Sequence, residues 1–161
     1  MGTMEFHTRQ WPTSDQVRET IDALTQSACP SSEAGIIDFL SIRGIHTDVG
    51  SPGGTGDLVS YDFHAPGTHF TGQWHIDGSS IRVIATFGGT RAEIESHLEL
   101  YRSELVRVLG EPAQEKGMAH APRLAWHRQK HGITLDAFWS DPQLSVLMLA
   151  VELKDTDPSG Q

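Results

Sequence analysis

Regularly spaced apolar residues predict one long amphipathic helix in the second half of the chain. It begins at Thr90, whose hydroxyl can accept a hydrogen bond from the Glu93 amide while the Glu93 carboxylate accepts one from the Thr90 amide. Gly110 followed by Pro112 ends the helix, because glycine adopts a left-handed cap and proline cannot continue it. The expected buried stripe repeats at steps of three and four residues and comprises Ile94, His97, Leu98, Tyr101, Leu105, Val108 and Leu109.

Alternation of apolar and polar residues predicts two groups of strands that form an antiparallel sheet. Before the long helix, the turn sequences APGT and DGSS separate three expected strands, at 58–64, 70–76 and 81–87. After the helix, three more are expected at 124–126, 133–139 and 144–153. The sheet residues expected to bury Leu98, Tyr101 and Leu105 of the helix include Trp126, Leu135 and Val146.

Two shorter helices are predicted near the start of the chain. Thr13 and Gln16 form a second capping box, and an apolar stripe follows them. Ser31 or Ser32 can cap a further apolar segment at 36–42, for which helix and buried strand are both possible and helix is preferred.

The whole pattern predicts a single α+β domain with helices packed on an antiparallel sheet. The stretch from His46 to Gly56 has many glycines and little apolar surface, so we expect an exposed loop there. The predicted order is α-α-β-β-β-α-β-β-β over residues 1–153. The polar residues 154–161 are expected to form a disordered tail.

The acidic composition limits the classes of partner. There are 21 acidic and 12 basic residues, which gives a net charge of -9 with neutral histidine, so nucleic acid and anionic membranes are not expected ligands. Such a charge favours solubility or a basic protein partner. The only cysteine, Cys29, excludes an intramolecular disulfide framework. Without a membrane-span pattern or a signal-peptide core, a soluble cytoplasmic protein is expected.

The histidine-rich hairpin offers the sharpest candidate for chemistry. If the APGT turn closes symmetrically, His64 faces His69 and Asp62 faces Thr71, on the sheet face opposite the apolar residues of these strands. Two imidazoles and a carboxylate could bind zinc or iron. Polar residues on a solvated sheet face are the simpler interpretation, because no third ligand has a diagnostic spacing. We therefore expect no metal and no cofactor.

No other motif marks a catalytic centre. The glycine-rich SPGGTG stretch lacks the GK[ST] ending that handles phosphate and magnesium. No GxSxG turn presents a nucleophilic serine. We therefore expect a protein that is not an enzyme.

The C-terminal half adds a resemblance to a known family. Its landmarks are the LGxP end of the long helix at 109–112, Gly117, Pro122, Trp126 and the apolar stretch 133–135. Over residues 79–153 the chain resembles a family of small actinobacterial immunity-type proteins associated with polymorphic toxins of type VII secretion systems. The resemblance implies a binding protein and carries over no catalytic residue.

The function expected from residues and resemblance together is that of an immunity protein. It would bind a cognate secreted toxin domain and occlude the toxin's active site. The candidate contacts are the loop carboxylates Asp48, Asp57 and Asp62, with Trp139 beside Asp141 as an aromatic anchor. A small metal-binding protein or enzyme that uses the His64 hairpin is the alternative, and a secretion-chaperone-like adaptor is the third possibility.

Overall fold

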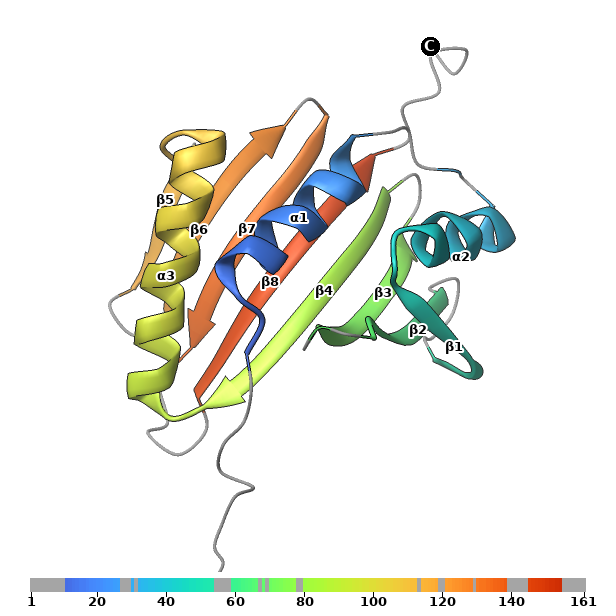
Figure 1. The fold of residues 1–161 in the computed structure, drawn as a ribbon, viewed down its shortest axis with the longest axis horizontal. Helices are drawn as coiled ribbons and strands as arrows, with labels where there is room; N and C mark the ends of the chain where they lie inside the picture. Colours follow the sequence, from blue (N-terminus) through green and yellow to red (C-terminus); the bar gives the residue numbers. More distant parts are fainter. Residues whose placement is uncertain are drawn as a thin grey trace, which may run out of the picture.

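The computed structural model describes three helices packed on one sheet (Figure 1). It covers residues 11–154 apart from 27–29, 31, 54–58, 67, 69, 78–79, 113, 119–120, 129 and 139–144. The helices are α1 (Ser14–Thr25), α2 (Glu33–Ile42) and α3 (Arg91–Leu109). The strands are β1 (His46–Gly53), β2 (Val59–His64), β3 (Thr71–Asp77), β4 (Ser80–Gly89), β5 (Gln114–Met118), β6 (Ala121–Arg128), β7 (His131–Phe138) and β8 (Ser145–Lys154). None of the described helices is both long enough and apolar enough to cross a membrane.

The sheet joins two antiparallel groups of strands at its centre. Its order is β1-β2-β3-β4-β8-β7-β6-β5, and every neighbouring pair is antiparallel. The last strand of the chain, β8, pairs with β4 over ten residue pairs, from Ser80 with Lys154 to Gly89 with Ser145. The two halves of the sequence therefore share one continuous sheet.

The predicted α+β class is confirmed, but the predicted strand count is wrong. Among the described residues the sheet has eight strands. The expected loop after His46 forms β1, and the segment after Pro112 forms β5. Both are edge strands, which hydrogen-bond one neighbour only and need not show apolar alternation. The expected tail also begins too early, because Lys154 belongs to β8, and residues 155–161 lie outside the described part of the chain.

The helix ends follow the capping patterns of the sequence. In α1 the Gln16 amide donates to the Thr13 hydroxyl and the Thr13 amide donates to the Gln16 side chain, both at 3.0 Å. Thr90 and Glu93 make the same reciprocal pair at the start of α3, at 3.2 and 2.8 Å. The segment at 36–42 is helical, as preferred, and Ser32 caps it by accepting from the Gly35 amide at 3.0 Å.

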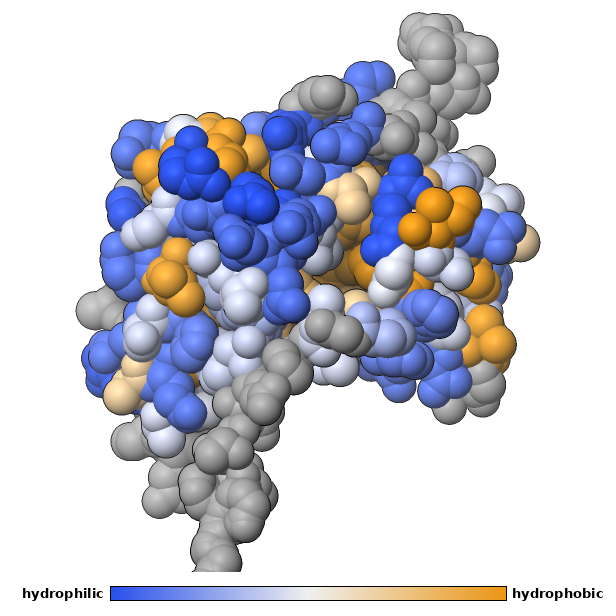
Figure 2. Space-filling view, viewed as in Figure 1, coloured by the Kyte–Doolittle hydropathy of each residue, from blue (hydrophilic) through white to orange (hydrophobic). Residues whose placement is uncertain are grey.

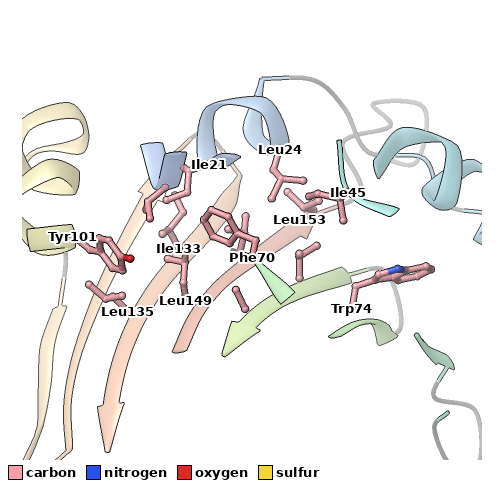
Figure 3. Packing of buried hydrophobic residues seen from close by; sticks show 14 of the residues in the cluster. Ile21, Leu24, Ile45, Phe70, Trp74, Tyr101, Ile133, Leu135, Leu149 and Leu153 are labelled. Carbon is pink, nitrogen blue, oxygen red and sulfur yellow. The ribbon is translucent and has the colours of Figure 1, made fainter. Parts of the chain in front are cut away.

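The core lies between the helices and one face of the sheet (Figure 3). Tyr101 and Leu105 of α3 are fully buried, whereas Leu98 is only half-buried at the edge of the core. The expected burial of Trp126 and Leu135 is confirmed.

The expected burial of Val146 is wrong. Val146 pairs with Gly88 of β4 and Phe138 of β7, and this register turns Leu147 into the core instead.

Candidate functional site

The face of the sheet opposite the helices is the candidate functional site. We call it the open face; it consists of His46 and Asp48 of β1, the even-numbered residues of β2, β4, β7 and β8, the odd-numbered residues 71–75 of β3 and the odd-numbered residues 123–127 of β6. In β2, Asp62 and His64 are exposed while Phe63 between them is buried. The buried residues of all three helices join the cluster on the other face, so no described helix covers the open face.

Two of the predicted contact residues meet at one end of the open face. Asp48 and Asp62 are directly opposite each other on β1 and β2, and both are exposed. The Gln73 side chain of β3 donates to Asp62 Oδ1 at 3.0 Å. Like charges directly opposite each other repel, so positively charged or hydrogen-bond-donating groups near either carboxylate stabilise the pair. The other candidates, Asp57, Trp139 and Asp141, lie outside the described residues.

The predicted hairpin register is wrong by two residues. His64 pairs with Thr71 and Asp62 with Gln73, and His69 lies outside the described residues. Thr68 explains the difference, because its hydroxyl donates to the Ala65 carbonyl at 2.8 Å and accepts from the Phe70 amide at 3.1 Å. These bonds make Ala65 and Phe70 the pair that closes the hairpin, whereas His64 and His69 were expected to close it. A register shift of two residues leaves every side chain on the same face of the sheet. Asp62 and His64 therefore still lie on the predicted face.

A histidine pair adjoins the two carboxylates. His46 lies opposite His64, with ring centroids 5.7 Å apart. Within the described ranges, no three His, Cys, Asp or Glu side chains are grouped so that they could hold a metal ion. The pair presents two imidazoles to solvent beside Asp48 and Asp62.

The other half of the open face contains a hollow of about 180 Å³. Residues paired across the strands form a polar row that runs His75, Arg82, Glu152, Gly132, His127. Gly132 has no side chain, so the row has a gap there. We call this gap the Gly132 hollow; it is lined by Arg82, Ala125, Trp126, His127, Gly132, Thr134, Ala150 and Glu152.

The charges around the hollow differ in whether they are paired. Arg123 donates to the buried carboxylate of Asp136 at 2.8 Å, and this hydrogen bond raises the pKa of Arg123. Lys154 lies 3.9 Å from Glu152. Arg82 makes no hydrogen bond or ion pair with any residue in the described part of the chain, and its Nε is buried without an acceptor. Arg82 is not among the residues predicted from the sequence; its place between the apolar Ile81 and Val83 is the signal that puts it on the open face.

The helix-covered side has a second concavity, between α1 and α2 (Figure 2). Its open mouth has a volume of about 280 Å³ and is lined in part by Thr20. A separate apolar crevice, also lined by Thr20, has a volume of only about 10 Å³. Arg43 spans the two helices, since its Nε donates to the Ala23 carbonyl at 2.7 Å and its Nη1 to the Phe39 carbonyl at 2.9 Å. The crevice has room for about one water molecule, so it is a weaker candidate than the open face.

The open face combines two chemistries on one surface. One end presents the Asp48 and Asp62 carboxylates, and the centre presents the Arg82 guanidinium, which lines the Gly132 hollow. Such a surface can form charged and hydrogen-bonded contacts with a second protein. Comparisons of the chain with protein-family models, with curated proteins and with solved structures found no match.

Proposed function

We propose that this chain is an immunity-type protein that binds a cognate secreted toxin domain through the open face and occludes the toxin's active site. The observation that carries the proposal is the direct opposition of Asp48 and Asp62 on a sheet face that no described helix covers. A cationic group of a partner placed between the two exposed carboxylates could contact both of them. The net charge of -9 would also attract a basic partner from solution.

The dimensions of the open face suit a protein partner. Seven strands from β1 to β6 in sheet order, about 4.8 Å apart, span about 29 Å. Strands of six to ten residues are about 20 to 33 Å long. The resulting area of roughly 600 to 900 Å² is comparable to the ~800 Å² that each partner contributes to a standard protein interface.

The open face also carries an exposed aromatic residue of the kind that anchors interfaces. Phe138, at the end of β7, is 41% exposed and lies opposite Val146. The predicted anchor Trp139 follows it in the chain but lies outside the described residues. Aromatic anchors supply much of the affinity, while rim carboxylates mainly accelerate association.

In this role the chain acts by steric occlusion and uses no catalytic group or cofactor of its own. It would work in the cytoplasm of the cell that makes the toxin, before secretion. Nucleic acid and membrane play no part in the proposed interaction.

Co-expression tests the proposal directly. We expect a secreted protein to be encoded beside this gene, its toxic C-terminal domain to co-purify with the chain, and cells that express both to survive. If the two proteins do not co-purify, and cells die equally with and without this chain, the proposal is wrong.

A charge-matched pair of variants locates the interface. Asp48→Asn/Asp62→Asn should slow association roughly 3- to 10-fold at low salt, with a smaller effect on dissociation. Asp38→Asn/Glu99→Gln removes the same charge from exposed helix positions and should leave association nearly unchanged. Equal effects of the two double variants would place the interface elsewhere.

The metal-binding alternative retains one supporting observation, the His46–His64 pair. Elemental analysis of the purified chain distinguishes it from the immunity proposal. One zinc or iron per chain that is lost in His46→Ala/His64→Ala would favour the alternative. Co-purification with a secreted protein without protection from its toxicity would instead favour the secretion-chaperone-like adaptor.

A further inference from the structure

The covered side of the sheet has a groove between α1 and α2. Figure 1 shows β4 passing between these helices, none of the described helices lies over it there, and Figure 2 shows a hollow at this place with apolar residues in it. We call it the α1–α2 groove; it comprises the open mouth and the apolar crevice, which share Thr20. The strand residues that line the crevice, Phe63, Phe70, Val83 and Ala85, are 3–5% exposed, whereas Ile133, Leu135 and Leu147 elsewhere in the core are 0% exposed. The core is therefore less completely covered at this groove.

The described part of the chain begins beside this groove, at Trp11. The Trp11 ring stacks on His97 with centroids 4.0 Å apart, and its centroid is 5.3 Å from that of Phe87 on β4. Phe87 in turn contacts Phe70, which lines the crevice, with centroids 5.9 Å apart. A continuous row of aromatic rings thus joins Trp11 to the groove.

The residues that precede Trp11 are numerous enough to reach the groove. Residues 1–10 lie outside the described part of the chain. Phe87, beside Trp11, and Val83, in the crevice, are separated by about 13 Å along β4 at roughly 3.3 Å per residue. An extended chain from Trp11 back to Phe6 spans up to about 17 Å. Phe6 can therefore reach Val83.

The sequence of this segment suits one apolar and one polar surface. In an extended conformation Met4 and Phe6 point to one side, and Glu5 and Arg9 point to the other. The mouth of the groove has a volume of about 280 Å³, far above the ~10–15 Å³ that one water molecule needs on the same measure. It therefore has room for an apolar side chain next to the crevice.

The charges of the segment follow the same order as the charges of the groove. Read back from Trp11, the segment presents Arg9 and then Glu5. Read from the start of α1, the groove presents Glu19 and then Arg43, which is hydrogen-bonded to the last turns of α1. The Glu19 side chain is 68% exposed, so it is open to a further contact. A segment that runs along α1 in this direction brings Arg9 to Glu19 and Glu5 to Arg43.

We infer that residues 1–10 dock in the α1–α2 groove, with Phe6 over the apolar crevice. The segment runs extended beside α1 and covers the part of the core that the helices leave uncovered. It joins α1 to α2 through contacts with both walls of the groove. The inference does not rest on the proposed function, because the groove and the open face lie on opposite sides of the sheet.

Nuclear Overhauser effects in the full chain test the docking directly. We expect effects between the Phe6 ring and the methyl groups of Thr20 and Ala23, which line the mouth. Phe6→Ser should abolish the docking, shift the amide signals of Thr20 and Ala23, and lower the melting temperature by roughly 2–4 °C. His7→Ser, on the other side of the extended segment, is the matched control and should change neither.

A charge reversal tests the direction of the segment. Arg9→Glu should move the Thr20 amide signal towards its position in Phe6→Ser, because the reversed charge faces Glu19. Adding Glu19→Arg should return the signal towards that of wild type. Adding Glu99→Arg instead, at an exposed position on α3, should not restore it.

Three results would overturn the inference. The first is the absence of any effect between the Phe6 ring and the methyl groups of the groove. The second is an equal response of the Thr20 and Ala23 amides to Phe6→Ser and His7→Ser. The third is an effect seen only between differently labelled chains in a mixture, which would place the segment of a second copy in the groove.

Discussion

The two faces of the sheet are formed by alternate residues of the same strands, but their side chains differ in burial. On the covered face, β8 contributes Leu147, Leu149, Val151 and Leu153, all nearly inaccessible to solvent. On the open face, the alternate residues of the same strand include Met148 and Glu152, both half-buried. Backbone hydrogen bonding is shared by the two faces, so the difference between them lies entirely in the side chains and in what covers them.

Polar groups differ less clearly between the two faces. Beneath the helices, the Trp126 indole donates to the Gly110 carbonyl at 2.9 Å, and the Tyr101 hydroxyl donates to the Pro12 carbonyl at 2.6 Å. Buried atoms without a hydrogen-bond partner occur on both sides: Trp11 Nε1 and Ser145 Oγ on the covered side, and Arg82 Nε on the open face. On the open face, Asp48 and Asp62 also lie directly opposite each other.

Truncating the core should cost much more stability than truncating the open face. Leu105→Ala removes a fully buried side chain and should lower the free energy of unfolding by about 2–5 kcal/mol. Met148→Ala on the open face should cost less than about 1 kcal/mol. Half-buried Leu98→Ala should lie between them. Urea denaturation measures all three, and equal losses for Leu105 and Met148 would contradict the assignment of the two faces.

Two glycines give a second matched comparison. A Cβ at Gly72, on the covered side of β3, would lie 1.9 Å from the Ile84 carbonyl oxygen, so β4 would have to move. We expect Gly72→Ala to cost about 1–3 kcal/mol or more. Gly132→Ala, on the open face, should be within about 0.5 kcal/mol of wild type or slightly stabilising, because alanine loses less backbone entropy on folding. If Gly72→Ala left the melting temperature unchanged, β3 and β4 would be less tightly spaced at this position than the structure shows.

Acidification should destabilise the fold through one buried histidine. Burial lowers the pKa of His131 below its ordinary value of 6.5, and its Nδ1 accepts from the Lys154 amide at 3.3 Å. The unfolded chain therefore takes up a proton at higher pH than the folded one. This contribution to stability is complete above about pH 6.5 and declines as the pH falls from there through the lowered pKa.

His131→Asn isolates this effect, since the asparagine oxygen can still accept from the Lys154 amide and does not titrate. Urea denaturation at a series of pH values should show a shallower decline below pH 6.5 than in wild type. His127→Asn, at an exposed open-face position, is the control for the substitution itself and is measured over the same pH series. A profile for His131→Asn identical to that of wild type would assign the acid sensitivity to other groups.

The smallest expected effect has the opposite sign. Asp62→Asn removes the like-charge repulsion with Asp48, while its side-chain oxygen can still accept from Gln73. The free energy of unfolding should rise by a few tenths of a kcal/mol at low salt, and the gain should shrink as salt screens the charges. A clear loss of stability at low salt would show that the carboxylate serves the fold rather than a partner.

Features encoded within a few residues were predicted well. Both capping boxes form at Thr13 and Thr90, and α3 ends at Gly110, because these interactions join neighbours along the chain. The alternation of apolar and polar residues also involves only neighbours along the chain, and it correctly predicted that Asp62 and His64 lie on the solvent side. The α+β class followed from these patterns alone.

Features that depend on pairing between distant strands were not predictable in this way. The edge strands β1 and β5 exist because neighbouring strands supply their hydrogen bonds. The hairpin register is an exception, because it was predicted wrongly although Thr68 bonds only with Ala65 and Phe70, close to it in the chain. The pairing of β4 with β8, distant in sequence, turns Leu147 rather than Val146 inward and brings Arg82 beside Glu152. Local sequence patterns specify which residues favour helix, strand and solvent. Which strands become neighbours depends on the packed core, because a strand can make its hydrogen bonds with any compatible partner and only the core selects one arrangement.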